Sequence, residues 1–149
     1  MRHHPDLRDA GAVGEIRAFA EPVPTASAAA EAVGCAVGAI ANSLVFEADG
    51  APLLVLASGA HRVHLGRLAD RLGTGKIRRA SPEFVLEHTG QVVGGVAPVG
   101  HPAPLRTVID RALEPFPVLW AGAGDERTIF ATSYTEPIAL TTATPADVD

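Results

Sequence analysis

Two apolar runs on either side of an Asp-Gly pair constrain the fold of this chain more than any other feature. Residues 43–47 read Ser-Leu-Val-Phe-Glu and residues 52–56 read Pro-Leu-Leu-Val-Leu, with Asp49-Gly50 between them. Asp-Gly favours the positive φ angles of a two-residue type I′ turn, which joins two antiparallel strands. We therefore predict a β-hairpin centred on residues 49–50.

Helix signals stand on both sides of this hairpin. Thr25 is placed to cap an alanine-rich helix over residues 26–33, which ends at Gly34. Residues 65–72 carry leucines and an alanine on one face, with Gly73 just beyond the helix end. Ser81 caps a further helix that begins at Pro82 and runs to about residue 88. The first half of the chain therefore combines helices with strands.

The second half favours strands. We expect a short strand at 108–109, and a second hairpin of residues 118–121 and 128–131 around Gly124-Asp125-Glu126. A helical turn is expected at 136–140, followed by a fraying tail, whereas residues 5–19 fit either a short helix or a strand. The 149 residues fit one domain. The expected fold class is α+β, a single mixed sheet with flanking helices.

Composition limits the compartment and the chemistry. Apolar residues make up 47% and charged residues 19%, so the chain can bury a core. A lone Cys35, expected to be apolar filler rather than a nucleophile, excludes an internal disulfide and favours a reducing compartment. No signal-peptide or membrane-spanning run is present, so we expect a cytoplasmic protein. His61 and His64 lack a third ligand nearby, and no metal or cofactor is predicted.

Charge is distributed unevenly. The net charge of −5 argues against a general nucleic-acid binder, and no DNA partner is expected. Residues 61–79, called the basic segment below, carry about +5, which leaves about −10 on the remainder. The segment is either a solvated helix face or a patch that contacts phosphates. Its basic residues are Arg62, Arg67, Arg71, Lys76, Arg78 and Arg79.

A glycine-rich stretch, residues 94–101, reads Gly-Gly-Val-Ala-Pro-Val-Gly-His. Three glycines and Pro98 within it do not suit a regular helix or strand. Glycines bring backbone N–H groups close to a ligand, and such amides suit a carbonyl or a developing oxyanion. The alternative is a tight surface loop with no ligand.

Several segments, taken in order, resemble the YbaK/EbsC family of trans-editing aminoacyl-tRNA deacylases associated with prolyl-tRNA synthetase. The resemblance covers roughly residues 20–140, and its most specific part is the glycine-rich stretch followed about ten residues later by Ile109-Asp110. The remaining segments that carry it are 40–46, the Asp49-Gly50 hairpin, 56–59, 77–80 and 89–90.

This resemblance implies a pocket that takes the aminoacyl end of a mischarged tRNA and hydrolyses its ester. Asn42, Ser43 and Asp110 are then the candidate catalytic residues, with Asp110 beneath the loop, orienting its neighbours or the substrate amino group. For Asp110 the alternative is an exposed turn residue after a strand. The implied substrate-binding residues are Thr25, Gly94, Gly95, Ala97, Pro98, Gly100 and His101. The implied partner is the acceptor end of aminoacyl-tRNA, contacted by the basic segment.

Position 42 departs from the family pattern. Family members typically carry lysine there, just before the Ser/Thr-Leu pair, and their activity depends on it. Asn42 is neutral and cannot supply fixed positive charge, although its amide donates and accepts hydrogen bonds. Ala97 also stands where some members have serine. Two hypotheses therefore stand: a deacylase for a small amino acid, or a binding module that has kept the pocket and lost catalysis.

Overall fold

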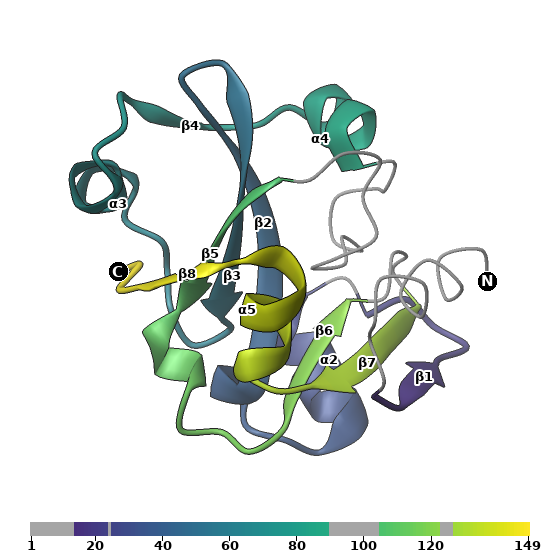
Figure 1. The fold of residues 1–149 in the computed structure, drawn as a ribbon. Helices are drawn as coiled ribbons and strands as arrows, with labels where there is room; N and C mark the ends of the chain where they lie inside the picture. Colours follow the sequence, from purple (N-terminus) through teal and green to yellow (C-terminus); the bar gives the residue numbers. More distant parts are fainter. Residues whose placement is uncertain (1–13, 24, 90–104, 123–126) are drawn as a thin grey trace.

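The computed structural model describes residues 14–23, 25–89, 105–122 and 127–149. Within these residues one mixed sheet of eight strands runs in the order β1-β7-β6-β2-β3-β5-β8, and β4 pairs with β2 off this path (Figure 1). The pairs β2–β6, β3–β5 and β5–β8 are parallel, and the others are antiparallel. The predicted fold class, α+β with a single mixed sheet, is confirmed.

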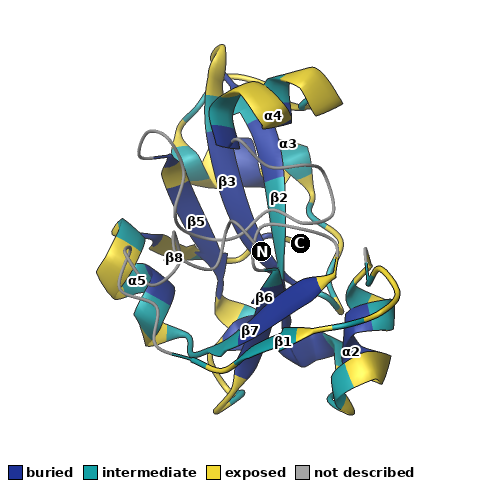
Figure 2. Cartoon of the chain, turned by 90° about the vertical axis from the view of Figure 1, so that its right-hand side faces the viewer, coloured by how far each residue is buried: buried dark blue, intermediate teal, exposed yellow. Residues whose placement is uncertain are grey.

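The predicted hairpin is confirmed, and its strands are longer than the apolar runs from which it was predicted. β2 spans Ile40–Ala48 and β3 spans Ala51–Ser58, with Ala48 opposite Ala51. Asp49 and Gly50 have φ angles of 53° and 81°, as a type I′ turn requires. Leu53, Leu54, Val55 and Leu56 are fully buried, so β3 forms the centre of the core. Most of β3 is buried, whereas β2 is only partly buried at residues 42–44, and the site is built on these two strands (Figure 2).

Four helices cover the sheet in the described residues. α3 (Leu65–Leu72) packs on one face through Leu68 and Ala69, against residues such as Phe46 and Val108. On the other face lie α4 (Pro82–Thr89) and α5 (Thr135–Thr141), through Val85 and Ile138. α2 (Ala26–Val33) packs on a third cluster that contains Trp120 and Ile129. No described helix has the length and apolar character needed to cross a membrane.

Local sequence signals explain where these helices begin and end. Thr25 Oγ1 accepts from Ala28 N at 3.1 Å, and Ser81 Oγ accepts from Phe84 N at 3.1 Å, so both predicted caps are present. Gly34 and Gly73 close α2 and α3 in the left-handed conformation. His64 caps α3 by accepting from Arg67 N at 3.1 Å, a role that the sequence did not suggest.

The second half confirms the paired strands β6 (Leu119–Gly122) and β7 (Thr128–Thr132), whereas their expected turn, 124–126, lies outside the described residues. β5 spans Arg106–Asp110, longer than predicted. Two short strands, β4 (Ile77–Arg79) and β8 (Thr144–Ala146), were not predicted, whereas β1 (Ile16–Ala18) lies in the segment for which helix and strand were both left open. Within residues 5–19, for which helix and strand were both possible, residues 16–18 form a strand.

The expectation of a fraying tail is wrong. β8 adds a parallel strand to β5, with Val108 opposite Thr144 and Asp110 opposite Ala146. Val148 is fully buried, and His64 N donates to its carbonyl oxygen at 2.7 Å. Apolar burial and backbone hydrogen bonds therefore hold a segment that is too short to give a strand signal of its own.

Candidate functional site

One edge of β2 is open for part of its length. Its other edge pairs with β3 from Ala41 to Ala48, whereas the open side pairs with β6 only at residues 40–41 and with β4 only at residues 46–48. No described strand therefore covers residues 42–45 on that side, and we call this stretch the β2 gap.

The register shows which peptide groups face the β2 gap. In a two-residue hairpin the pair next to the turn exchanges both hydrogen bonds, and bonded and non-bonded pairs then alternate. At the far end of the strand Gly59 N donates to Ile40 O at 2.8 Å, so this pair is hydrogen-bonded, as the alternation counted from the turn requires. The N–H and C=O groups of Ser43 and Val45 consequently point away from β3, into the gap.

A cavity of about 520 Å³ lies along the β2 gap, and we call it the main cavity. This volume is within the usual range for small-molecule sites, about 300–1,000 Å³. Its described lining combines β2 residues with the chain after β3 and the start of α4: Thr25, Ala26, Asn42, Ser43, Leu44, Val45, Phe46, His61, Arg62, Val63, Leu65, Arg79, Ala80 and Val85. The main cavity is therefore lined by apolar side chains together with polar and cationic ones.

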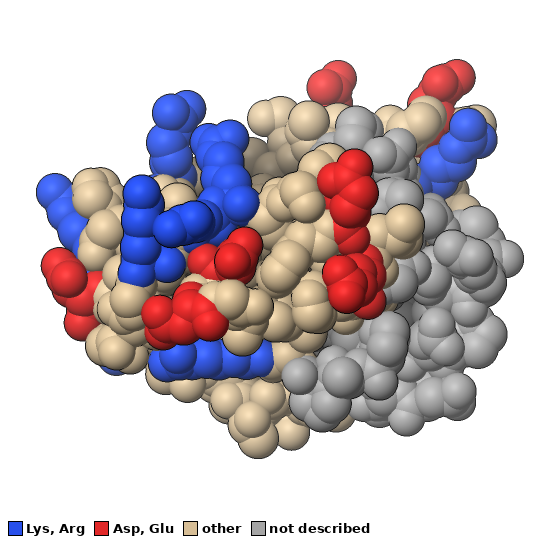
Figure 3. Space-filling view, turned by 90° about the horizontal axis from the view of Figure 1, so that it is seen from above, with Lys and Arg blue, Asp and Glu red and all other residues tan. Residues whose placement is uncertain are grey.

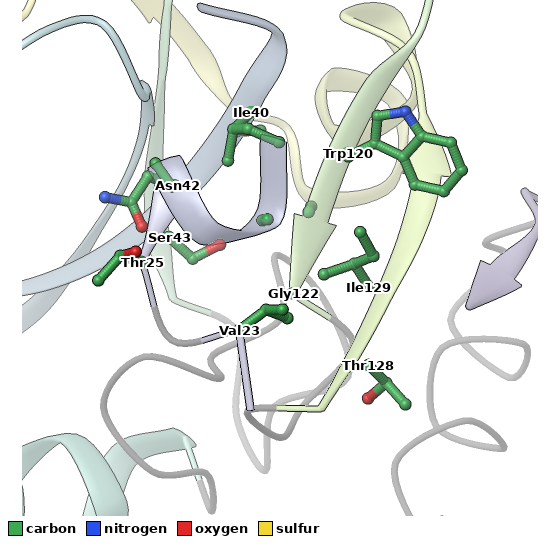
Figure 4. Close-up of a pocket in the computed structure, with 13 residues that line it drawn as sticks. Val23, Thr25, Ile40, Asn42, Ser43, Trp120, Gly122, Thr128 and Ile129 are labelled. Carbon is green, nitrogen blue, oxygen red and sulfur yellow. The ribbon is translucent and has the colours of Figure 1, made fainter. Parts of the chain in front are cut away.

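A second cavity of only about 30 Å³ adjoins the same residues and is called the side cavity (Figure 4). It shares Thr25, Ala26, Asn42 and Ser43 with the main cavity and adds residues of β6 and β7. Ser43 Oγ and Thr128 Oγ1 are both buried with no hydrogen-bond partner among the described residues, and both residues line the side cavity. Buried hydroxyls normally have partners, so this cavity suits a water molecule or a small polar group.

Asn42 and Thr25 lie where the two cavities meet. Figure 4 shows the Asn42 amide and the Thr25 side chain close to Ser43 on one side of the side cavity. Thr25 Oγ1 already accepts the capping bond of α2, whereas the Asn42 side chain has no partner within the described residues. The amide of Asn42 is therefore free to bind a ligand in the main cavity.

Asp110 ends β5 and is 1% exposed, so its interpretation as an exposed turn residue is wrong. Its Oδ2 accepts from Ser58 N at 3.0 Å and lies 2.9 Å from His61 Nδ1. Its Oδ1 accepts from Ala112 N at 2.9 Å. Asp110 is not among the described residues that line either cavity; it reaches the main cavity only through His61.

A tight turn carries His61 from β3 to that position. His61 N donates to Ser58 O at 2.9 Å. A Cβ at Gly59 would lie 2.5 Å from Val37 O, so the close backbone approach here requires glycine. The turn brings His61 to Asp110 from 49 positions away in sequence.

The basic segment divides between the cavity and the outer surface. Arg62 and Arg79 line the main cavity, whereas Arg67, Lys76 and Arg78 are exposed and are not among its described lining residues. Figure 3 shows basic side chains gathered on one part of the face seen from above, with a few acidic groups among them. Arg71 contacts the tail instead: its Nη1 donates to the backbone oxygens of Asp147 and Asp149 at 2.7 and 3.1 Å.

The remaining predicted residues divide into two groups. The glycine-rich stretch with Gly94, Gly95, Ala97, Pro98, Gly100 and His101 lies outside the described residues. Cys35 is partly buried and packs beside α2, and burial raises the pKa of its thiol, partly offset by a backbone hydrogen bond. A thiol with a raised pKa is a poor nucleophile, as expected for apolar filler.

Two residues of the site were missed by sequence reasoning. The sequence analysis considered His61 only together with His64, as a metal pair that it rejected, and gave neither a role; in the structure His61 contacts Asp110 and His64 caps α3. Thr128 is predicted only as part of a strand. No local pattern marks either residue, because each acquires its surroundings from a segment distant in sequence.

Comparison with known proteins identifies the family. The sequence profile of the aminoacyl-tRNA editing domain matches residues 20–140. The uncharacterised protein YwhH of Bacillus subtilis (strain 168) is 30% identical over 115 residues, covering 76% of this chain and 73% of YwhH. The proline–tRNA ligase of Lysinibacillus sphaericus (strain C3-41) is 33% identical over 87 residues, 58% of this chain but only 15% of the ligase.

Solved structures agree with the sequence comparison. The structure of a candidate trans-editing enzyme for prolyl-tRNA synthetase superposes with a TM-score of 0.91 at 38% identity, covering 99% of this chain and 95% of that chain. The resemblance to the YbaK/EbsC family is thereby confirmed. The chain belongs to the aminoacyl-tRNA editing domain family.

Proposed function

We propose that this chain is a free-standing deacylase that hydrolyses the ester of a tRNA mischarged with a small amino acid. The observation that carries the proposal is the main cavity at the β2 gap: it is lined by Asn42 and Ser43, and neither the amide of Asn42 nor the hydroxyl of Ser43 has a hydrogen-bond partner among the described residues. Membership of an editing family supplies the reaction class. Because translation takes place in the cytoplasm, we propose that compartment for the protein.

The residues at the β2 gap suit an aminoacyl ester. The outward N–H groups of Ser43 and Val45 can donate to a carbonyl oxygen, and the Asn42 amide can donate to the ester or hold a water molecule. Ala26 and Ala80 line the main cavity with short side chains, and the side cavity has room only for a small group. These features favour a small amino acid over a large one.

The cationic margin suits the tRNA. Arg62 and Arg79 line the main cavity, and Arg67, Lys76 and Arg78 extend the positive surface beyond it without an ion pair to any described acid. An acidic protein that binds tRNA needs such a surface to meet phosphates without repulsion. The acceptor end would then enter the main cavity while the adjoining phosphates contact the basic segment.

A second function is favoured by one specific observation. Asn42 stands where the resemblance places a lysine on which family activity depends, and Lys76, the only lysine, lies in another segment. A chain without that charge could bind an aminoacyl end, a small metabolite or a protein partner and no longer hydrolyse it. The cavity geometry serves binding equally well.

A deacylation assay separates the two functions. Purified protein in excess is mixed with tRNAs charged with glycine, alanine, serine, proline and other amino acids, and the loss of each ester is followed against a reaction without protein. A deacylase should hydrolyse at least one small aminoacyl-tRNA faster than background, and leave the larger esters intact. Binding of a charged tRNA with no acceleration of any ester in the panel would establish the binding module instead.

A further inference from the structure

The contact between Asp110 and His61 joins a buried carboxylate to the wall of the main cavity. Asp110 is 1% exposed and accepts from two backbone N–H groups, those of Ser58 and Ala112. Its remaining contact is His61 Nδ1, 2.9 Å from Oδ2. The two backbone bonds fix the carboxylate, so it holds the His61 ring in one orientation.

This contact determines which nitrogen of His61 carries the proton. A carboxylate can only accept, so Nδ1 carries the hydrogen and Nε2 of the neutral ring keeps its lone pair. Nε2 forms no hydrogen bond with a described residue, and the neighbouring Asp149 Oδ2 is 3.7 Å away on a side chain that is 58% exposed. His61 thus offers a basic nitrogen on a partly exposed side chain that lines the same cavity as Asn42.

Charged groups approach the ring from several elements. Asp110 faces it from the end of β5 and Asp149 from the tail, whereas Arg62 and Arg79 share the lining of the cavity. The two carboxylates face different nitrogens of the ring: Asp110 contacts Nδ1, and Asp149 Oδ2 lies 3.7 Å from Nε2. The arginines remain close enough to the cavity to attract an anionic tRNA.

We propose that His61 is the general base of this site, and that Asp110 is the residue that positions it. This inference rests on the proposed deacylase function. His61 Nε2 takes a proton from a water molecule as the water oxygen bonds to the ester carbonyl carbon. The tetrahedral intermediate then breaks its bond to the ribose oxygen, and His61 returns the proton to that oxygen. The products are the free amino acid and a tRNA with its terminal hydroxyl restored.

The roles of the two residues differ in kind. His61 touches the attacking water and is a catalytic residue, whereas Asp110 acts through His61 by fixing its tautomer and direction. Asn42 and the outward amides of the β2 gap retain the task of holding the ester. The arrangement supplies the base that the sequence did not reveal.

The test measures single-turnover hydrolysis of alanyl-tRNA made from the proline tRNA, at saturating protein and across pH 5 to 8.5, with uncatalysed loss subtracted. His61→Gln should lower the rate about 100- to 10,000-fold with little change in the protein concentration that saturates it. The pH dependence of the rate should differ between wild type and His61→Gln. Added imidazole should partly restore His61→Ala.

Two further variants separate catalysis from folding. Asp147→Asn changes an exposed acid of the same tail, which is not among the described residues that contact His61 or line the main cavity, and this variant should stay within about threefold of wild type. Asp110→Asn should lose rate and alter the pH profile. Nitrogen-15 NMR of the wild-type histidines, which needs no activity, should show His61 protonated at Nδ1 when neutral.

Each remaining outcome overturns the proposal. If wild type hydrolyses the ester and His61→Gln is equally fast, His61 is not the base, although the deacylase function stands. Loss of affinity with an unchanged maximal rate would make His61 a binding residue. A neutral ring protonated at Nε2 would remove the lone pair on which the proposal rests. If wild type hydrolyses none of the charged tRNAs in the panel, the deacylase function fails and the base with it.

Discussion

Two buried polar sites lie near opposite edges of β3, and they differ in whether their hydrogen bonds are complete. At the end of β5, both oxygens of Asp110 have partners, two backbone N–H groups and His61 Nδ1. Beyond the β2 gap, the hydroxyls of Ser43 and Thr128 are buried and have no hydrogen-bond partner in the part of the chain that the structure describes. Both sites belong to one sheet, and only the second is left open by the described residues.

We propose that the difference separates a residue that fixes the fold from residues whose hydrogen bonds a ligand or water molecule would complete. A carboxylate that accepts three bonds helps to fix the backbone around it, and its loss leaves buried donors unpaired at about 1–3 kcal/mol each. An unpartnered hydroxyl carries that cost in the native state already. Removing the first kind of group should therefore lower stability, whereas removing the second kind should leave stability nearly unchanged or raise it.

Asp110→Ala should show the largest effect. The substitution leaves the N–H groups of Ser58 and Ala112 without their acceptor, and it releases His61. We expect the free energy of unfolding to fall by about 2–5 kcal/mol, measured by urea denaturation. The matched control is Asp147→Ala, an exposed acid in the tail, which should change it by less than about 0.5 kcal/mol. Equal destabilisation of the two variants would break the comparison.

Asn42→Ala tests the β2 gap. Its amide has no partner within the described residues, so the variant should unfold at nearly the wild-type urea concentration. Single-turnover deacylation should nevertheless slow by roughly 10- to 1,000-fold, as for the loss of one positioned polar group. Unchanged hydrolysis by the folded variant would show that Asn42 has no chemical role.

The same contrast applies to two arginines on α3. Arg71 is bonded to tail carbonyls, whereas Arg67 makes no ion pair with a described acid. Arg67→Glu with Arg78→Glu should weaken tRNA binding and flatten the slope of log affinity against log salt, by about 1 for each phosphate that the protein no longer neutralises. Hydrolysis of a small aminoacyl ester should be unaffected by the double variant.

Arg71→Ala serves as the counterpart to that double variant. It should lower stability by about 1 kcal/mol, because two tail carbonyls lose their donor, and leave most of the salt dependence in place. If both variants left tRNA binding unchanged, the basic segment would be a solvated face only, and the binding-module alternative would gain support.

Thr128→Val should have the smallest effect. The methyl group replaces a buried hydroxyl without a partner, so the change should be nearly neutral or should raise stability by up to about 1 kcal/mol. Differential scanning calorimetry checks the sign. A decrease of more than about 1 kcal/mol would mean that an ordered water completes the hydroxyl and that the side cavity is part of the fold.

The sequence predicted those parts of the fold that have local signals. The Asp-Gly turn, the caps Thr25 and Ser81 and the glycines that end α2 and α3 all act within a few residues. β8 was missed because a three-residue strand becomes stable only through its pairing with β5 and the burial of Val148.

The candidate site was predictable only in part for the same reason. The resemblance singled out Asn42 and Ser43, which the structure places on the same cavity, and Asp110, which it places behind His61. The β2 gap depends on where β4 and β6 stop pairing with β2, which no local pattern encodes. His61 and Thr128 likewise have neighbours set by the tertiary fold alone.

The central claim is that the β2 gap receives the aminoacyl end of the tRNA. The most direct test is NMR titration with adenosine carrying alanine through an amide at its 3′ position, which mimics that end and resists hydrolysis. We predict that the amide signals of residues 42–45 and the signals of His61 and Thr128 shift together and saturate, while those of Arg71 and Asp147 stay still. Saturable shifts elsewhere, with residues 42–45 unmoved, would contradict the account.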